Sequence, residues 1–457
     1  MSKFSDNERK KISSNGAEKT DKKGYHKRAN DSVKKGYHKK SDNAHKREYQ
    51  NKEDNSGKKG YRNKVSSADN GEFTKKKSIC PVSGRCGGCS MIDEPYNEQL
   101  TKKEAMVRKL LNPYVKTDKI IGMENPMHYR NKVHAVFAHK KDGTIVSGVY
   151  KEGTHIVVPV EKCLIENELA DEIIGTIRGM LKSFKIKTYN EDTGYGFLRH
   201  VLVRTGHESG QVMVVLVVAS NVFPSRNNFI KALLKAHPQI TTVVMNYNDK
   251  NTSMVLGEKE RVLYGKGYIE DTLCGCRFRI SSKSFYQVNS IQTEKLYNLA
   301  IDYAGLSGNE IVFDAYCGIG TIGIIASKKA GKVIGVELNK DAVRDAVRNA
   351  KVNSIGNIDF YNNDAGKFMA QYASQGASAD VVFMDPPRAG SDELFMENML
   401  TLMPKKIVYI SCNPVTLARD LKYLTGRGYE VMKATPVDMF PCTEHVEVVC
   451  CLHRVNS

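Results

Sequence analysis

Residues 311–323 read Ile-Val-Phe-Asp-Ala-Tyr-Cys-Gly-Ile-Gly-Thr-Ile-Gly, an apolar run that ends in a glycine-rich turn. The apolar run predicts a buried strand, and the glycines predict a tight turn that opens a helix. An apolar segment at Lys332–Leu338 and a helical pattern at Asp341–Val352 follow along the chain. Regular alternation of strand and helix is typical of a doubly wound parallel sheet, so we expect an α/β domain over residues 281–457.

Three acidic residues stand at the ends of successive predicted strands. Glu337 ends the strand after the glycine-rich turn, and Asp364 and Asp385 follow the next two. A carboxylate at Glu337 can accept hydrogen bonds from both hydroxyls of a ribose, which fits NAD and S-adenosylmethionine. The segment Asp385–Arg388, Asp-Pro-Pro-Arg, leaves a carboxylate and carbonyl groups facing the crevice and favours S-adenosylmethionine. As an alternative, each acid could cap a helix.

A second apolar run, Ile407–Pro414, ends by presenting Cys412 at a polar turn that a proline stops. Open α/β sheets bind their ligands in the crevice outside the strand ends. Cys412 is therefore a candidate nucleophile. The alternative is a small buried core residue, which is what most free cysteines are.

Three cysteines, Cys80, Cys86 and Cys89, lie close together in sequence, and Cys163 follows far downstream. Thiolates this close would repel one another unless a soft cation lay between them, so the spacing predicts a metal centre. A three-plus-one arrangement is more typical of a four-cysteine iron–sulfur cluster than of zinc, whose structural sites recruit separated pairs. Zinc and a segment without metal are the alternatives.

Residues 1–77 carry 23 Lys and Arg against 11 Asp and Glu, a net charge of +12 out of +18 for the whole chain. They contain few aliphatic residues, so we expect a disordered basic arm. A motif of the type Lys-Lys-Gly-Tyr-His-Lys recurs, with one degenerate copy, from Lys22, Lys34, Lys46 and Lys58. Cations for phosphates and a tyrosine in each repeat favour RNA binding, and a solubilising tail is the alternative.

Residues 78–280 are expected to form a central α+β domain, because alternating apolar runs predict strands and amphipathic segments predict helices there. Several cations stand at the ends of these strands: Arg130, Lys132, Arg199, His200 and Arg204. As a group they are predicted to contact RNA, whereas solvated surface charge is the default for each one alone.

The motifs together resemble those of one enzyme family. In chain order they are the four cysteines, Ser284–Asn289, Asp314–Gly320, Asp385–Arg388, Ser411–Pro414 and His445–Glu447. From about Ser78 onward the sequence is similar to the RNA (uracil-5-)-methyltransferase family, and specifically to its iron–sulfur branch acting on 23S rRNA. The resemblance implies a class I S-adenosylmethionine-dependent methyltransferase fold and 5-methyluridine as the product.

The resemblance also implies roles for single residues. C5 of uracil is too poor a nucleophile to take a methyl group unaided, so Cys412 would first add to C6, and Glu447 would later remove the C5 proton. Arg388 would favour the thiolate of Cys412. S-adenosylmethionine would contact Gln287, Tyr316, Glu337 and Asp385, with Asp364 near the adenine, and a [4Fe–4S] cluster would be held by Cys80, Cys86, Cys89 and Cys163.

The expected partner is RNA. 23S rRNA is the expected substrate, tRNA is the alternative, and a non-catalytic iron–sulfur redox sensor is a third reading that the intact Cys412 and Glu447 disfavour. We expect a cytoplasmic monomer without membrane association, because the sequence has neither a run of about 18 apolar residues nor a signal peptide. Many family members begin with an RNA-binding β-barrel. The region before Cys80 lacks the apolar strands for one, so the basic arm is expected to supply phosphate affinity instead.

Overall fold

The computed structural model describes residues 77–455. By its internal contacts the chain divides into two units, Met1–Phe73 and Thr74–Ser457, and every described residue belongs to the second. The basic arm predicted over residues 1–77 therefore lies outside the described residues, Lys77 excepted. Within residues 77–455, no helix is long and apolar enough to cross a membrane.

The C-terminal half is built on a seven-stranded sheet in the order β12-β11-β10-β13-β14-β16-β15. The first five strands are parallel, and β16 runs antiparallel to both of its neighbours, β14 and β15. The apolar runs of the sequence form the central strands, as predicted. The strands are β10 (Ile311–Ala315), β11 (Lys332–Glu337), β12 (Ile358–Asn362), β13 (Val381–Met384), β14 (Lys406–Ser411), β15 (Tyr429–Val437) and β16 (Glu447–Arg454).

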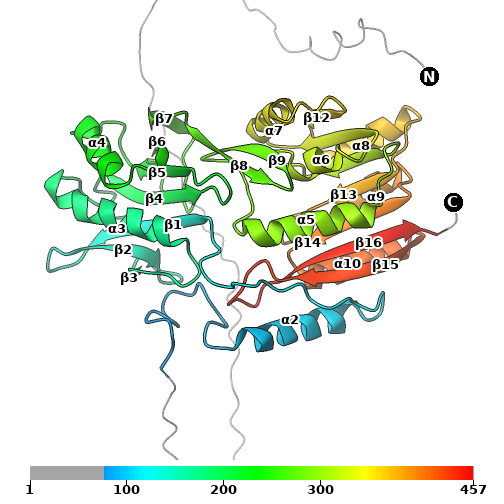
Figure 1. Cartoon of the computed structure of the whole chain (residues 1–457), viewed down its shortest axis with the longest axis horizontal. Helices are drawn as coiled ribbons and strands as arrows, with labels where there is room; N and C mark the ends of the chain where they lie inside the picture. Colours follow the sequence, from blue (N-terminus) through cyan, green and yellow to red (C-terminus); the bar gives the residue numbers. More distant parts are fainter. Residues whose placement is uncertain (1–76, 456–457) are drawn as a thin grey trace, which may run out of the picture. The chain divides into compact units, whose positions relative to one another are not determined.

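Helices cover both faces of this sheet, because successive strand residues point to opposite faces and both sets are apolar. Val312 of β10 packs into one core with α5 and α6, and its neighbour Phe313 packs into a second core with α8, α9 and α10. Figure 1 shows α5 and α6 in front of the strands. The helices are α5 (Ser290–Ala304), α6 (Thr321–Ala326), α7 (Lys340–Val352), α8 (Ala365–Ser374), α9 (Glu393–Leu400) and α10 (Pro414–Thr425).

The central region forms a second seven-stranded sheet in the order β3-β2-β1-β4-β5-β6-β7. Two helices, α3 (Glu168–Ser183) and α4 (Arg226–Ala236), cover one face, as Figure 1 shows. The strands are β1 (Lys132–His139), β2 (Ile145–Tyr150), β3 (Val157–Pro159), β4 (Leu198–Thr205), β5 (Val212–Val218), β6 (Ile240–Tyr247) and β7 (Lys259–Tyr264).

A hairpin of β8 (Tyr268–Leu273) and β9 (Cys276–Ser281) joins the two sheets. Its buried residues, such as Phe278, share one apolar core with Met213 of β5 and Leu296 of α5. The helix α2 (Tyr96–Leu111) begins after Pro95 and packs Val107 into the core that α8, α9 and α10 form on the other face of the C-terminal sheet. The amino-terminal segment is thereby attached to the C-terminal half.

Candidate active site

The glycine-rich turn joins β10 to α6, and its geometry explains its residues. Gly318 and Gly320 adopt positive φ angles of 54° and 83°, which glycine takes without strain. Tyr316, at φ 65°, adopts this conformation despite its side chain. The N–H of Gly323 donates to Asp314 Oδ2 at 2.7 Å, and a Cβ on Gly323 would lie 2.9 Å from that oxygen. Asp314 is therefore engaged in holding the start of the helix.

Two of the predicted cofactor acids also hold backbone. Glu337 accepts hydrogen bonds from the N–H of Gly318 at 3.1 Å and of Asn339 at 2.7 Å, which ties the turn to the end of β11. Asp364 accepts from the N–H of Lys367 at 2.9 Å and is the N-cap of α8. The helix-cap reading thus applies to Asp364, and its place near an adenine stays a prediction.

Asp385, Cys412 and Glu447 come together at one edge of the sheet. Asp385 directly follows β13, Cys412 directly follows β14, and Glu447 begins β16. Because β13 and β14 are parallel and β14 pairs with β16 so that Ser411 lies opposite Val448, the three positions are neighbours. The strand register therefore assembles a thiol and two carboxylates from segments up to 62 positions apart in the sequence.

Burial controls the protonation of this group. The pKa of Glu447 is raised first by burial and then by the charge of Asp385, and the pKa of Asp385 is raised by burial. Oε2 of Glu447 is buried and has no hydrogen-bond partner among the described residues. The pKa of the Cys412 thiol is raised to about 11 by burial, then by Glu447 and Asp385, while Arg388 lowers it. At neutral pH these raised pKa values favour a protonated Cys412 thiol and a pair of carboxyl groups, Asp385 and Glu447, that keeps a proton.

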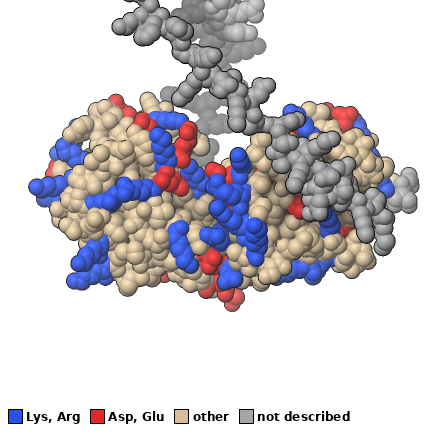
Figure 2. All heavy atoms as spheres, turned by 90° about the horizontal axis from the view of Figure 1, so that it is seen from above, with Lys and Arg blue, Asp and Glu red and all other residues tan. Residues whose placement is uncertain are grey.

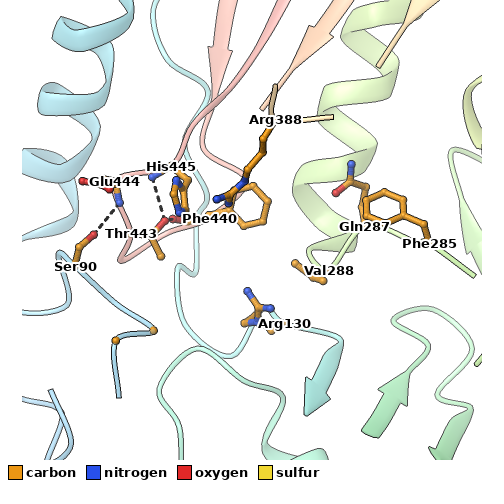
Figure 3. Close-up of a pocket in the computed structure, with 12 residues that line it drawn as sticks. Ser90, Arg130, Phe285, Gln287, Val288, Arg388, Phe440, Thr443, Glu444 and His445 are labelled. Atoms are coloured by element: carbon orange, nitrogen blue, oxygen red, sulfur yellow. Dashed lines mark hydrogen bonds between the residues drawn. The ribbon is translucent and has the colours of Figure 1, made fainter. Parts of the chain in front are cut away.

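A pocket of about 410 Å³ has Arg388 in its wall, and the charge of Arg388 acts on both Cys412 and Glu447, although neither of these two residues lines the pocket. Arg388 and Gln287 line it together with Phe440 and His445, which precede Glu447 in the sequence. Figure 3 shows Arg388 and Arg130 approaching from opposite sides of the view and Gln287 beside Phe285. Gly87, Gly88 and Ser90 of the cysteine segment complete the wall with Val288, Thr443 and Glu444.

Two aromatic side chains that line this pocket, Phe285 and Phe440, are not predicted from the sequence. Phe285 is 67% exposed, which is unusual for a large apolar side chain. Its signal in the sequence is its position inside the motif Ser284–Asn289, two residues before Gln287. Phe440 lies in the loop before β16 and carries no comparable signal.

The four predicted cluster cysteines are free thiols in one region of the structure. The pKa of Cys89 is raised to about 12 by burial and then by the neighbouring Cys442, Cys86 and Cys80. Cys80, Cys89 and Cys163 pack against the same small apolar cluster. Among the described residues, however, no set of three or more His, Cys, Asp or Glu side chains is arranged to hold a metal ion. The [4Fe–4S] cluster is thus not confirmed and stays a prediction.

Three cations predicted to contact RNA are instead buried, and that interpretation is wrong for them. Arg199 is 2% exposed and forms a fork with Glu191, with nitrogen–oxygen distances of 2.7 and 2.8 Å. Arg204 donates to the carbonyl of Ser284. His200 is buried, and its pKa is lowered to about 3, chiefly by burial. Arg204 finds its partner 80 residues away and Arg199 donates also to the carbonyl of Asn248, so the local sequence pattern does not reveal their burial.

The fold and the strand-end site define a class I S-adenosylmethionine-dependent methyltransferase, as predicted. The model of the tRNA (uracil-5-)-methyltransferase family matches residues 95–455, and the chain belongs to this family. It is accordingly an RNA methyltransferase.

Curated relatives share this assignment. An uncharacterized RNA methyltransferase of Halalkalibacterium halodurans is 41% identical, over 82% of this chain and 83% of the relative. One from Listeria monocytogenes is 42% identical, over 82% and 83%. The crystal structure of Pyrococcus abyssi tRNA (uracil-54, C5)-methyltransferase, in complex with S-adenosyl-L-homocysteine, is 27% identical with a TM-score of 0.68, and covers 81% of this chain and 86% of that one. The iron–sulfur branch and the 23S rRNA target stay predictions.

Proposed function

We propose that the protein transfers a methyl group from S-adenosylmethionine to C5 of a uracil in 23S rRNA, forming 5-methyluridine. The observation that carries this proposal is the convergence of Cys412, Glu447 and Asp385 at one edge of the sheet, where Arg388 connects them with a pocket that has aromatic and cationic walls. A thiol, a buried carboxylate and a flat-walled cavity are what addition to a pyrimidine ring requires.

The covalent step begins at Cys412. The thiol releases its proton to solvent, Sγ forms a bond to C6, and the electron pair of the C5–C6 double bond moves to C5, which forms the new bond to the methyl group. Bound S-adenosylmethionine supplies the electrophilic methyl group. Glu447, as a carboxylate, then takes the proton from C5, the double bond re-forms, and the thiolate leaves C6. Arg388 favours the thiolate, because its charge lowers the pKa of Cys412.

We assign the methyl donor to the crevice at the strand ends. The glycine-rich turn exposes backbone there, and Glu337 ends the neighbouring strand β11, where a ribose would lie. Tyr316 and Gln287 flank this crevice in the proposal, with Asp385 between donor and uracil and Asp364 toward the adenine.

The covalent mechanism is tested by trapping. A Glu447→Gln variant keeps the nucleophile but removes the base, so it should accumulate a protein–RNA adduct that survives denaturing gel electrophoresis. Cys412→Ala should form no adduct and no 5-methyluridine, and Cys412→Ala/Glu447→Gln should behave like Cys412→Ala. Full methyl transfer by Cys412→Ala would remove the proposed nucleophile.

The substrate class has one competing candidate. The family model and the Pyrococcus abyssi structure are both named for tRNA, which favours a uracil in tRNA. The 23S rRNA target rests on the cysteine pattern Cys80, Cys86, Cys89 and Cys163. Unmodified 23S rRNA and tRNA transcripts should be methylated in parallel reactions and their nucleosides analysed by mass spectrometry. Product in tRNA alone would replace the rRNA proposal.

We also propose that these four cysteines hold a [4Fe–4S] cluster. Support comes from the shared apolar surroundings of Cys80, Cys89 and Cys163, and from thiols whose raised pKa values disfavour thiolates unless a cation is present. Protein purified without oxygen should contain about four iron and four sulfide per chain and a broad visible absorbance. Cys163→Ser should lower the iron content, and stoichiometric zinc would contradict the proposal.

A further inference from the structure

Arg199 and Arg204 are buried, but other cations are exposed on the described surface. One group lies on β7, on the turn after it, and on and after β9: Lys259, Arg261, Lys266, Arg277, Arg279 and Lys283. We call these six residues the hairpin patch. Arg279 is half-buried and the other five are exposed, and within residues 77–455 none of the six forms an ion pair with a carboxylate. Their charges are therefore available to a ligand.

The same stretch contains three acids, of which one is buried. Asp271 is buried and accepts hydrogen bonds from the backbone N–H groups of residues 207–209. Glu260 accepts from two neighbouring side chains. Residues 259–283 hold six cations against three acids, Glu260, Glu270 and Asp271, which is a net charge of +3. This stretch presents a positive surface, and polyanions are its natural ligands.

Aromatic side chains interleave with these cations. The guanidinium of Arg279 lies 3.6 Å from the ring centroid of Tyr268, and the ammonium of Lys266 lies 5.9 Å from the same centroid. Tyr264, at the end of β7, is 44% exposed. Cations alternating with exposed rings are typical of surfaces that bind single-stranded nucleic acid, because phosphates meet the cations while unpaired bases stack on the rings.

The hairpin patch also leads to the pocket. Lys283 donates to the carbonyl of Glu258 at 2.7 Å, which fastens the segment after β9 to the start of β7. Phe285, two residues further on, is a wall of the pocket. Figure 2 looks onto the side where β7 and the β8–β9 hairpin lie in Figure 1, and Lys and Arg gather across its middle.

We propose that the hairpin patch is the docking surface for the RNA strand that flanks the target uracil. The strand's phosphates contact Lys259, Arg261 and Lys266, an unpaired base stacks near Tyr264, and the chain then turns toward Phe285 at the pocket. This inference rests on the proposed function for the identity of the target base. Single-stranded or looped RNA is the class of ligand, because paired bases offer no free face to the rings.

The test compares two triple variants of the full-length protein. One replaces Lys259, Arg261 and Lys266 with alanine. The matched control replaces three exposed lysines on the helices that cover the central sheet, and none of the three forms an ion pair within the part of the chain that the structure describes: Lys182, Lys231 and Lys235. Both remove three positive charges from the surface, so a general charge effect would appear equally in each. Thermal unfolding establishes that both variants are folded.

Binding is measured with a fluorescent oligouridylate and with a 23S rRNA transcript over a range of salt concentrations. Each lost phosphate contact lowers the slope of log K against log salt by about 0.7 for single strands, so the patch variant should lose about 2 from the slope. Its KM for RNA should rise at least about tenfold while kcat at saturating RNA is retained. The control should match the wild type.

The outcomes separate the two proposals. Equal slopes and equal KM values for the patch and control variants would overturn the docking surface, even if both methylate uracil normally. Absence of uracil methylation in every variant, with the difference in RNA binding still present, would overturn the proposed function and leave the docking surface. If the patch variant lost binding to an acidic protein but kept its binding to RNA, the hairpin patch would not be an RNA docking surface.

Discussion

Glu447 begins β16 as a buried carboxyl group whose Oε2 has no hydrogen-bond partner among the described residues, and the charge of Asp385 raises its pKa. Two buried carboxylates that raise each other's proton affinity do not both ionise readily. At neutral pH the pair therefore keeps a proton. In the proposed mechanism a proton must therefore leave this pair before Glu447 can accept one from C5, and the general base becomes available as the pH rises.

The first prediction concerns the pH dependence of methyl transfer. Under saturating RNA and methyl donor, the rate should rise with pH as Glu447 ionises. Asp385→Asn removes the charge that raises the pKa values of both Glu447 and Cys412, so its profile should shift to lower pH, whatever the loss in absolute rate. Single-turnover rates between about pH 6 and 9 would measure the shift. A profile that stays in place or moves to higher pH would contradict the coupling.

The second prediction concerns stability. A carboxyl group whose pKa is raised by folding contributes stability that is present below its ordinary pKa and is lost as the pH rises. Glu447→Gln keeps the neutral form at every pH, so it should unfold at a higher temperature than the wild type at pH 8. The gain should be on the order of 1 kcal/mol or more and should narrow toward pH 5. If Glu447→Gln were less stable than the wild type at pH 8, neighbouring groups would stabilise the buried Glu447 carboxylate, and the prediction would be wrong.

At the scale of elements, the loop before β16 is fixed by other parts of the chain. Each carbonyl of residues 438–442 accepts a hydrogen bond from a distant group, and the donors are Gln292, Asn289, Lys103, Tyr129 and the N–H of Met91. Lys103 of α2 also pairs with Asp438 at 2.6 Å, and both side chains are almost fully buried. Since the loop carries Phe440 and leads to His445 and Glu447, α2 positions one wall of the pocket.

The third prediction tests this connection. Lys103→Met leaves the Asp438 carboxylate buried without its cation and should destabilise the protein by about 3–5 kcal/mol. Lys103→Met/Asp438→Asn removes both charges and should recover part of the loss, as measured by urea unfolding. If the ion pair positions the loop, the double variant should also regain part of the kcat lost in the single one. A double variant no more stable than the single one would contradict this role.

The sequence predicts elements better than it predicts their partners. The sequence predicts the strands at Ile311 and Lys332 because apolar runs bounded by turns have few other interpretations. It also predicts that the acids at the strand ends lie together, because parallel strands end at the same edge of the sheet. The amphipathic pattern of α2 shows that one face is buried but not that it packs on the methyltransferase sheet. Arg199 likewise shows no sign of its fork with Glu191, because burial depends on tertiary contacts that the local pattern does not carry.

At the scale of the whole molecule, two parts of the chain carry an excess of positive charge that the proposals assign to RNA binding. Residues 1–77 hold a net charge of +12, and the hairpin patch adds six cations on the described surface. Phosphate contacts are largely independent of base sequence, whereas the pocket and its reactive residues act on one base. Under the proposed function, affinity for RNA would thus depend on the basic arm and the hairpin patch, and selection of the uracil would depend on the pocket.

The fourth prediction follows from this separation. Deleting residues 1–76 should weaken RNA binding and flatten its salt dependence, since fewer counterions are released, while kcat at saturating RNA is retained. Combined with alanine at Lys259, Arg261 and Lys266, the two changes in log K should add, because they remove contacts to different phosphates. Filter binding at several salt concentrations, with the truncated protein and the full-length control side by side, measures both effects. Unchanged binding on truncation would show that the basic arm does not contact RNA, and a combined loss smaller than the sum would show that arm and patch bind the same phosphates.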